Sequence, residues 1–298
     1  MLLYGPTGSG KSTLGAELIK TLFKEDKRRA LVFMADEGSR QPYAILEKLG
    51  VCTLVRPEGN PWIWVDRAFQ GLVKVKGGWV KAVTYIEDLG LIIHEGLTAY
   101  AESLMQEMAR MSAENINVGG EGVATLGKDK EKDEKNVLKA WKFEVKGDDK
   151  EVLRIGGNSM AHYGIAQVQI REGFGKVRPA VPHLYTATLR RGQEEGTKAP
   201  VCGPQIVGGA LTGMLPRWLD YTFQAESEGE SHVLYLMPHP DSVAGGRTMA
   251  MANSRLPLEG GSVKVPMSVK PASLVKALQV IAARKEAAFA DVKAELGL

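Results

Sequence analysis

Apolar residues along this chain gather in short runs, separated by segments in which apolar positions recur every three or four residues. The runs are typical of buried strands, and we expect strands over residues 1–4, 30–35, 51–55, 89–94 and 182–188. The segments with the helical period predict helices over residues 12–23, 42–49, 66–75, 98–111 and 160–171. Because these strands and helices alternate, the pattern predicts an α/β fold with a mainly parallel central sheet flanked by helices.

Two segments depart from this alternation. Residues 141–155 alternate around a Gly-Asp-Asp turn, which predicts a β-hairpin inside a glycine-rich, charged insert over about residues 115–157. Residues 271–296 open with a proline, are rich in alanine and predict an amphipathic helix. We therefore expect a core over residues 1–255, interrupted by a flexible insert, and a C-terminal extension over residues 256–298 that contains the helix.

Composition narrows the class of protein. The 298 residues include 38 Lys and Arg against 35 Asp and Glu, a net charge of +3. So small a charge excludes a protein held to nucleic acid or membranes by bulk charge, but it is compatible with a local basic patch. The two cysteines, Cys52 and Cys202, form neither a disulfide framework nor a cysteine zinc site, which favours a reduced, cytoplasmic setting. No apolar run approaches the ~20 residues that span a membrane, so we expect no membrane partner.

The strongest motif lies between the first predicted strand and the first predicted helix. Residues 5–12, Gly-Pro-Thr-Gly-Ser-Gly-Lys-Ser, match every fixed position of the phosphate-binding pattern G-x-x-x-x-G-K-[ST]. Glycines allow backbone N–H groups to curve around a phosphate, the lysine supplies a cation and the serine hydroxyl binds Mg²⁺. No N/T-K-x-D base-reading element typical of GTPases is present, which favours ATP. The candidate nucleotide-binding residues are Gly5, Pro6, Thr7, Gly8, Ser9, Gly10, Lys11, Ser12 and Thr13.

Carboxylates follow two of the predicted strands. Asp36 and Glu37 end the second strand, where a carboxylate can orient and deprotonate an attacking water. Glu95 ends the apolar run over residues 89–94, the place at which an acid holds Mg²⁺ through its water ligands. Asp88 is the rival for that role, although the segment before it is less apolar. Both acids stay candidates.

Four segments together resemble the RecA-like ATPases. They are the phosphate-binding motif, residues 33–37 with the following Lys-Leu-Gly-Val at 48–51, the Ile-His-Glu-Gly-Leu-Thr stretch at 93–98, and residues 184–190. The resemblance implies that Glu37 is the water-activating base, that Glu95 takes the place of the usual metal-site aspartate, and that Thr188 takes the place of a γ-phosphate sensor that is usually glutamine. Tyr43, shortly after the glutamate, is a candidate for stacking on the adenine.

More narrowly, the layout resembles the core-only RecA-like ATPases of bacteriophages, over roughly residues 1–275. The shared features are the Gly-Pro-x-x-x-Gly segment at 203–208, the Leu-Pro-x-Trp stretch at 215–218 and the Asn-x-Arg element at 253–255. This resemblance implies a phage-encoded, Mg²⁺-dependent ATPase in the host cytoplasm that acts on single-stranded DNA in recombination, annealing or replication. It also implies a homo-oligomer with ATP near the subunit interfaces.

RecA-like proteins bind DNA with two mobile loops. The matching stretches here are about residues 115–158, whose mixed charges favour a solubilising linker, and residues 190–200. The second stretch holds the candidate DNA-binding residues Arg190, Arg191 and Lys198, because basic side chains on a flexible loop can track phosphates. Two glutamates lie among them, so an ordinary solvated loop is the alternative interpretation.

Two other functions fit the sequence. A P-loop kinase for a nucleotide or small molecule would use Arg190 and Arg191 as a lid over the transferred phosphate. A non-enzymatic nucleotide-binding module is suggested by the departures from the family pattern at Glu95 and Thr188.

Overall fold

The structure, a computed structural model, describes residues 1–115, 140–144, 152–156, 160–177, 180–193, 200–206, 208–229, 231–237 and 265–296. Its strands are β1 Leu2–Gly5, β2 Arg29–Met34, β3 Cys52–Val55, β4 Leu72–Val75, β5 Gly78–Lys81, β6 Leu89–Glu95, β7 Ala140–Glu144, β8 Val152–Gly156, β9 His183–Gln193, β10 Pro200–Pro204, β11 Thr222–Glu228, β12 Ser231–Tyr235 and β13 Ser268–Val269. Its helices are α1 Lys11–Asp26, the 3₁₀ turn η1 Glu37–Ser39, α2 Gln41–Lys48, α3 Pro61–Phe69, α4 Ala82–Tyr85, α5 Leu97–Asn115, α6 Met160–Lys176, α7 Gly208–Trp218 and α8 Leu274–Glu295.

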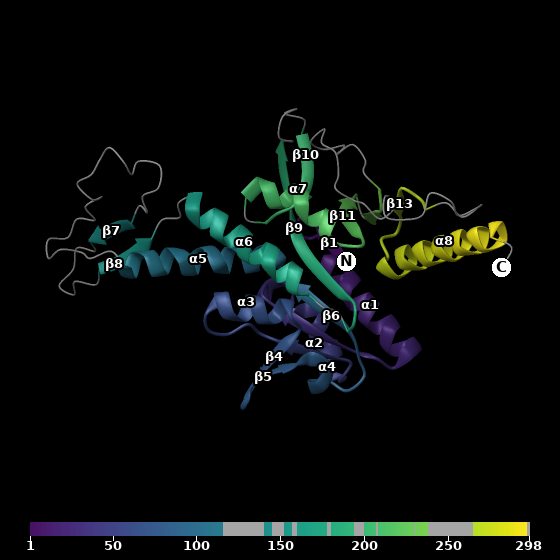
Figure 1. Cartoon of the computed structure of the whole chain (residues 1–298), viewed down its shortest axis with the longest axis horizontal. Helices are drawn as coiled ribbons and strands as arrows, with labels where there is room; N and C mark the ends of the chain where they lie inside the picture. Colours follow the sequence, from purple (N-terminus) through teal and green to yellow (C-terminus); the bar gives the residue numbers. More distant parts are fainter. Residues whose placement is uncertain are drawn as a thin grey trace.

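A central sheet organises these elements, in the order β13-β12-β11-β1-β9-β6-β2-β3 (Figure 1). Neighbouring strands from β11 through to β3 run parallel, whereas β12 and β13 extend that edge in antiparallel fashion. The predicted fold class, α/β with a mainly parallel sheet flanked by helices, is therefore confirmed. The order places β9 between β1, which precedes the phosphate-binding motif, and β6, which ends at Glu95.

Alternating side chains divide the core into two layers, because successive strand residues point to opposite faces of a sheet. On one face, Leu2, Phe33 and Ile92 pack with α3, α5, α6 and α7. On the other, Leu3, Val32 and Ile93 pack with α1, α2 and the first half of α8. The strands are thus apolar on both faces, as their continuous apolar runs predict.

The structure corrects two sequence expectations. Residues 66–75, expected as one helix, are the end of α3 and then β4, which forms an antiparallel hairpin with β5. Gly71 separates the two with φ of 66°, a backbone conformation that favours glycine and ends the helix. Residues 190–193, expected in a mobile loop, continue β9 and pair with β10.

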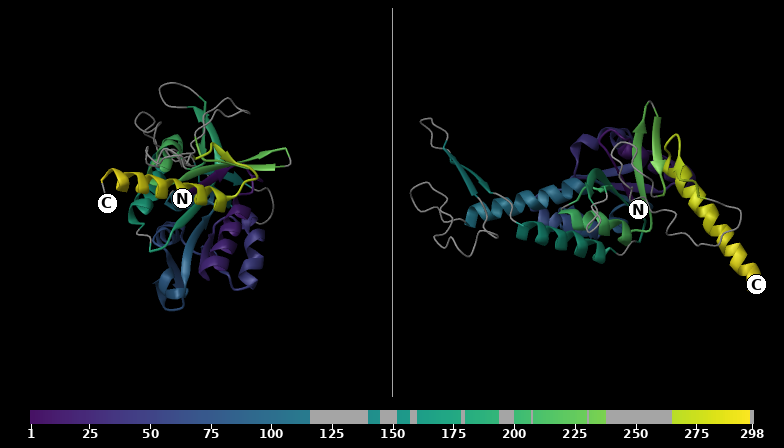
Figure 2. Two further views of the ribbon diagram at one scale, coloured as in Figure 1. Left: turned by 90° about the vertical axis from the view of Figure 1, so that its right-hand side faces the viewer. Right: turned by 90° about the horizontal axis from the view of Figure 1, so that it is seen from above.

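The predicted hairpin in the insert is present as β7 and β8, which pair antiparallel. The rest of the insert lies outside the described residues, as does the Asn-x-Arg element at 253–255. The predicted C-terminal helix is α8, which runs away from the sheet (Figure 2). Within the described part of the chain, no helix is both long enough and apolar enough to cross a membrane.

Candidate functional site

The phosphate-binding motif forms the turn between β1 and α1. Gly8 and Gly10 have φ of 81° and 82°, conformations that side-chain-bearing residues rarely adopt. Gly10 is the N-cap of α1 and offers no side-chain cap, so the first-turn N–H groups of α1, at Lys11, Ser12 and Thr13, keep their donors for an anion. The loop is therefore shaped as a phosphate cradle.

Close packing at the first residue of this loop requires glycine. A Cβ on Gly5 would lie 2.1 Å from the carbonyl oxygen of Ala225 and 2.6 Å from Oγ of Ser9. Only glycine fits where β1 passes so close to β11.

Lys11 lies over the first part of the loop. Its Nζ donates to the carbonyl oxygens of Gly5 at 2.9 Å and Pro6 at 2.8 Å. Burial lowers the pKa of Lys11, and the nearby carboxylates of Glu95 and Asp36 oppose that shift. The ammonium group thus lies inside the loop, in the field of both acids.

Glu95 reaches the same place from the end of β6. Its Oε1 accepts a hydrogen bond of 2.8 Å from Oγ of Ser12, and its Oε2 accepts one of 2.7 Å from the hydroxyl of Tyr43. The side chain is buried, and burial raises the pKa of Glu95, while the hydroxyl donors favour its ionised form. Asp88 precedes β6 at the opposite end of the strand, so of the two rival acids it is Glu95 that lies beside the phosphate-binding loop.

The oxygens of Ser12 and Glu95 are the ligand types that Mg²⁺ prefers, and Mg²⁺ is usually held by one or two protein groups together with waters and substrate phosphates. Within the described residues, no group of three or more His, Cys, Asp or Glu side chains is arranged to hold a metal ion. The pair therefore fits a magnesium ion that is shared with a bound nucleotide.

Tyr43 does not fit the predicted base-stacking role. Its ring is fully buried between α2 and the core, and a buried ring has no free face for an adenine. Its hydroxyl instead binds Glu95, and this contact together with burial raises the pKa of Tyr43 well above its ordinary value. Sequence reasoning placed Tyr43 near the nucleotide but missed this partner, 52 positions away in the chain.

Asp36 and Glu37 follow β2 and contact different partners. Asp36 caps η1, since its carboxylate accepts hydrogen bonds from the Gly38 amide at 3.0 Å and the Ser39 hydroxyl at 3.1 Å. Glu37 is half-exposed and forms an ion pair of 3.1 Å with Arg56, which follows β3. Asp36 is thus held by its own turn, whereas the side chain of Glu37 contacts a solvent-exposed arginine.

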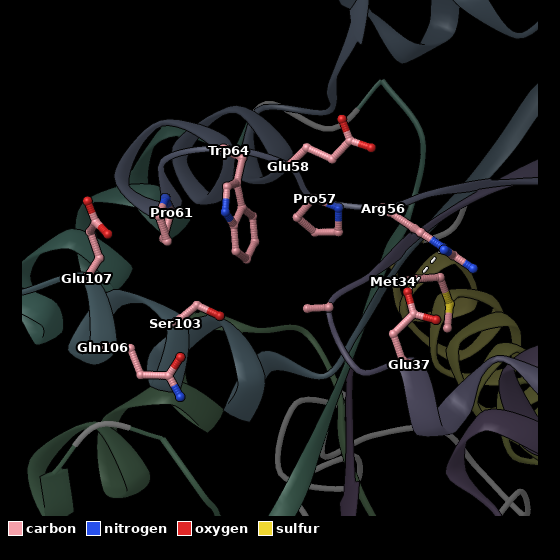
Figure 3. Close-up of a pocket in the computed structure, with 12 residues that line it drawn as sticks. Met34, Glu37, Arg56, Pro57, Glu58, Pro61, Trp64, Ser103, Gln106 and Glu107 are labelled. Atoms are coloured by element: carbon pink, nitrogen blue, oxygen red, sulfur yellow. Dashed lines mark ion pairs between the residues drawn. The ribbon is translucent and has the colours of Figure 1, made fainter. Parts of the chain in front are cut away.

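A cavity of about 570 Å³ opens beside Glu37 (Figure 3). In the close-up, Trp64 points into its middle, while the Glu37–Arg56 pair closes one side and Ser103, Gln106 and Glu107 of α5 form another. None of the residues of the phosphate-binding loop lines it. Glu37 therefore faces a space distinct from the phosphate cradle itself.

Thr188, the predicted sensor, lies in β9 directly beside Gly5 of β1. Its amide donates to Oγ1 of Thr98 at 3.0 Å, and its carbonyl accepts from the Gln205 amide at 2.6 Å. The adjacent Thr186 accepts from the Gly96 amide at 2.9 Å. These contacts tie β9 to the residues after Glu95, so Thr188 lies between the phosphate loop and the acid.

Two of the three predicted DNA-binding residues, Arg190 and Arg191, fall on the β9–β10 ribbon. Arg190 is half-buried and pairs with Gly203, and Arg191 pairs with Cys202 through the backbone. Lys198 lies outside the described residues.

Sequence reasoning also missed His232. This exposed residue of β12 hydrogen-bonds through Nδ1 to Oγ of Ser227 at 3.1 Å, and its ring would lie 3.7 Å from a Cβ on Gly10. The β11–β12 hairpin thus borders the loop at the start of α1. No local sequence pattern could have indicated this contact, because 222 positions separate His232 from Gly10 (232 − 10).

No protein-family model and no curated protein matches this chain. Among solved structures, the chain is similar to the KaiC-like protein PH0186 from the hyperthermophilic archaeon Pyrococcus horikoshii OT3. The two are 12% identical with a TM-score of 0.35, over 78% of this chain and 74% of that one.

Proposed function

We propose that this chain is a RecA-like, Mg²⁺-dependent ATPase that acts on single-stranded DNA. The observation that carries the proposal is the 2.8 Å hydrogen bond between Ser12 of the phosphate-binding loop and Glu95. It brings the two oxygen ligands expected of a magnesium–nucleotide site to the helix N-terminus where a phosphate would bind.

Each residue has a defined task in this proposal. The loop amides and Lys11 hold the β- and γ-phosphates, and Ser12 and Glu95 hold the metal, whose charge stabilises the phosphoryl group in transfer. Tyr43 fixes the Glu95 carboxylate by its hydrogen bond of 2.7 Å. Glu37 orients and deprotonates the attacking water, a role open to it because Arg56, with which it forms an ion pair, is solvent-exposed. Thr188, next to Gly5, senses the γ-phosphate.

The DNA and assembly parts of the proposal come from the resemblance to phage RecA-like ATPases. Arg190, Arg191 and Lys198 contact the phosphates of single-stranded DNA along and beyond the β9–β10 ribbon. The protein assembles from copies of itself, with ATP near the contacts between them. It works in recombination, annealing or replication of phage DNA in the host cytoplasm.

The decisive experiment measures inorganic phosphate released from ATP with and without single-stranded DNA, in Mg²⁺ and in EDTA. We expect release that requires Mg²⁺, rises with DNA, and falls at least about 10²-fold in Lys11→Ala. Conversion of ATP to ADP with a phosphorylated acceptor and no free phosphate would show a kinase instead. Tight ATP binding without turnover, unchanged by Glu37→Gln, would show a nucleotide-binding module.

A further inference from the structure

The apolar stripe of α8 continues beyond the part of the helix that covers the core. Leu274, Ala277 and Ile281 are buried against the body, and Ala288 is the last buried residue. From residue 289 to residue 296 every position is exposed. Val292 nevertheless lies on the same side as Leu274, because their separation of 18 positions makes about five turns.

This exposed end carries large apolar side chains. Phe289 is 71% exposed, Leu296 67% and Val292 40%, and their spacing places all three on one side of the helix. In two views at right angles, the end of α8 projects away from the other labelled elements (Figures 1 and 2). A surface helix without a partner does not need this stripe, since exposed apolar surface promotes association.

A second apolar pair lies on the outer side of α2. Ile45 is 67% and Leu49 68% exposed, four positions apart and therefore on one side of the helix. Among the described residues, the four most exposed large apolar side chains are this pair together with Phe289 and Leu296. These four side chains thus belong to two separate apolar surfaces, each on a helix.

We propose that the end of α8 of one copy docks on α2 of the next copy. Helices α2, α1 and α8 form one layer on the same face of the sheet, with α1 in contact with both of the others. The two apolar surfaces belong to the outer members of this layer, so a second copy continues the layer by placing its α8 beside α2. The contact is head-to-tail, and repeating it produces a ring or a filament.

Charges beside the two surfaces favour the same pairing. Lys48 is exposed next to Ile45 and Leu49. The end of α8 carries exposed Asp291 and Glu295 against one exposed lysine, Lys293, so its net charge is −1. Opposite charges at the rim of a contact help to select the partner and orientation. The two surfaces together comprise only five large apolar side chains, Ile45, Leu49, Phe289, Val292 and Leu296, so a single contact is weak and we expect association to increase with protein concentration.

The proposed contact lies on the helix that supports the candidate site. The inner side of α2 carries Tyr43, whose hydroxyl binds Glu95, while Ile45 and Leu49 lie on its outer side. The docked α8 end of the next copy therefore packs on the side of α2 opposite to Tyr43. The association itself does not depend on ATP, so it is measured without nucleotide, and its failure leaves the proposed ATPase function standing.

Analytical ultracentrifugation of the full chain over a concentration series tests the proposal. We expect the wild type to associate as concentration rises, and Ile45→Asp/Leu49→Asp and Phe289→Asp/Leu296→Asp each to weaken association at least tenfold. A 1:1 mixture of the two variants retains one intact α8 end and one intact α2 surface, so it should form dimers and nothing larger. Ile165→Asp, which charges another exposed apolar residue of 50% exposure, should associate as the wild type does.

Three results would overturn the proposal: a wild type that stays monomeric throughout, a double variant that associates like the wild type, or a mixture that stays monomeric. The last would show that the end of α8 and the outer side of α2 do not bind each other. Far-UV circular dichroism checks that each variant is folded. Independently, Leu49→Cys/Leu296→Cys protein treated with a short bis-maleimide should give cross-linked ladders, and neither single cysteine variant should give more than dimers.

Discussion

The hydroxyl of Ser12 donates a 2.8 Å hydrogen bond to Glu95, joining the first turn of α1 to the end of β6 across 83 positions of sequence. Because β9 lies between β1 and β6, this contact spans one intervening strand at the carboxyl edge of the sheet. Tyr43 approaches the same carboxylate from α2. Residues of α1, α2 and β6, three elements far apart in the sequence, therefore meet at the buried carboxylate of Glu95.

We expect Glu95→Gln to reduce magnesium-dependent ATP hydrolysis by about 10²-fold or more, since it removes the charge that would hold the metal in the proposed site. The same variant should unfold at an equal or higher temperature than the wild type. The reason is that burial raises the pKa of Glu95, so that the ionised carboxylate is unfavourable in the folded protein at neutral pH. Phosphate release and a thermal melt at pH 7 measure the two effects.

Asp88→Asn is the matched control. Asp88 has φ of 57°, a conformation that asparagine also tolerates, so the variant tests the rival acid without straining the backbone. It should keep wild-type turnover. Loss of activity in Asp88→Asn with full activity in Glu95→Gln would reverse the assignment.

Two isosteric substitutions test which of Glu37 and Asp36 is the general base. Glu37→Gln should slow hydrolysis by about 10²-fold or more if it is the general base, with ATP affinity retained. Its unfolding free energy should change by no more than about 0.5 kcal/mol, because its ion pair with Arg56 is solvent-exposed. Asp36→Asn preserves the acceptor for the Gly38 amide and should retain most of the activity. The opposite ranking of the two rates would make Asp36 the base.

The sequence predicted what depends on local residue types. The phosphate-binding motif is contiguous, so its turn and the following helix could be placed from spacing alone. Glu95 was predictable because a buried parallel strand delivers its last residue to the carboxyl edge, where the phosphate loop also lies. The alternation of Leu2, Leu3 and their counterparts in β2 and β6 likewise follows from apolar runs.

What the sequence did not predict depends on backbone pairing and tertiary contact. The extension of β9 through Gln193 is stabilised by hydrogen bonds to β10, and its polar side chains give no strand signal. The sequence did not predict the β4–β5 hairpin, because the apolar residues on either side of Gly71 also fit the period of a helix. Tyr43 and Leu46 are spaced to face the core, but nothing local shows that the Tyr43 hydroxyl meets Glu95.

Gly5 is predicted to be the glycine of the loop that is least tolerant of a side chain for steric reasons. In Gly5→Ala, the new Cβ would meet the Ala225 carbonyl oxygen at 2.1 Å, and this backbone atom cannot move away without displacing β11. We expect a loss of about 1–3 kcal/mol or more in unfolding free energy, measured by urea titration. Gly77→Ala, where a Cβ meets nothing within 4 Å, is the control and should change stability little. Equal stability of the two variants would contradict the close approach of β1 and β11.

Behind Glu95, on the opposite face of the sheet, two buried histidines predict an acid-sensitive fold. Nε2 of His94 lies 3.1 Å from Nδ1 of His183, and the His94 ring stacks between aromatic neighbours that include Phe33 and Tyr185. The hydroxyls of Tyr100 and Tyr185 also contact the two rings, and the Met1 amino group donates to the His183 carbonyl oxygen at 2.7 Å. Burial lowers the pKa of His94 well below its ordinary value and that of His183 to about 4. Both rings therefore stay neutral in the folded protein at pH 6.

The sign of the pH dependence follows from these shifts. Below about pH 6.5 the unfolded chain binds protons at both histidines while the folded chain does not, so stability falls as the pH drops from about 6.5 towards 4. Each histidine contributes a slope of up to about 1.4 kcal/mol per pH unit in that window. Urea unfolding at intervals between pH 7.5 and pH 5.5, above the range in which most carboxylates titrate, measures the slope. His94→Phe/His183→Phe should make the slope shallower, and the part that stays includes the amino group of Met1, whose pKa burial lowers to about 6. His232→Gln, which removes an exposed histidine, should leave the slope unchanged. A slope in the double variant as steep as that of the wild type would assign the acid sensitivity to other groups.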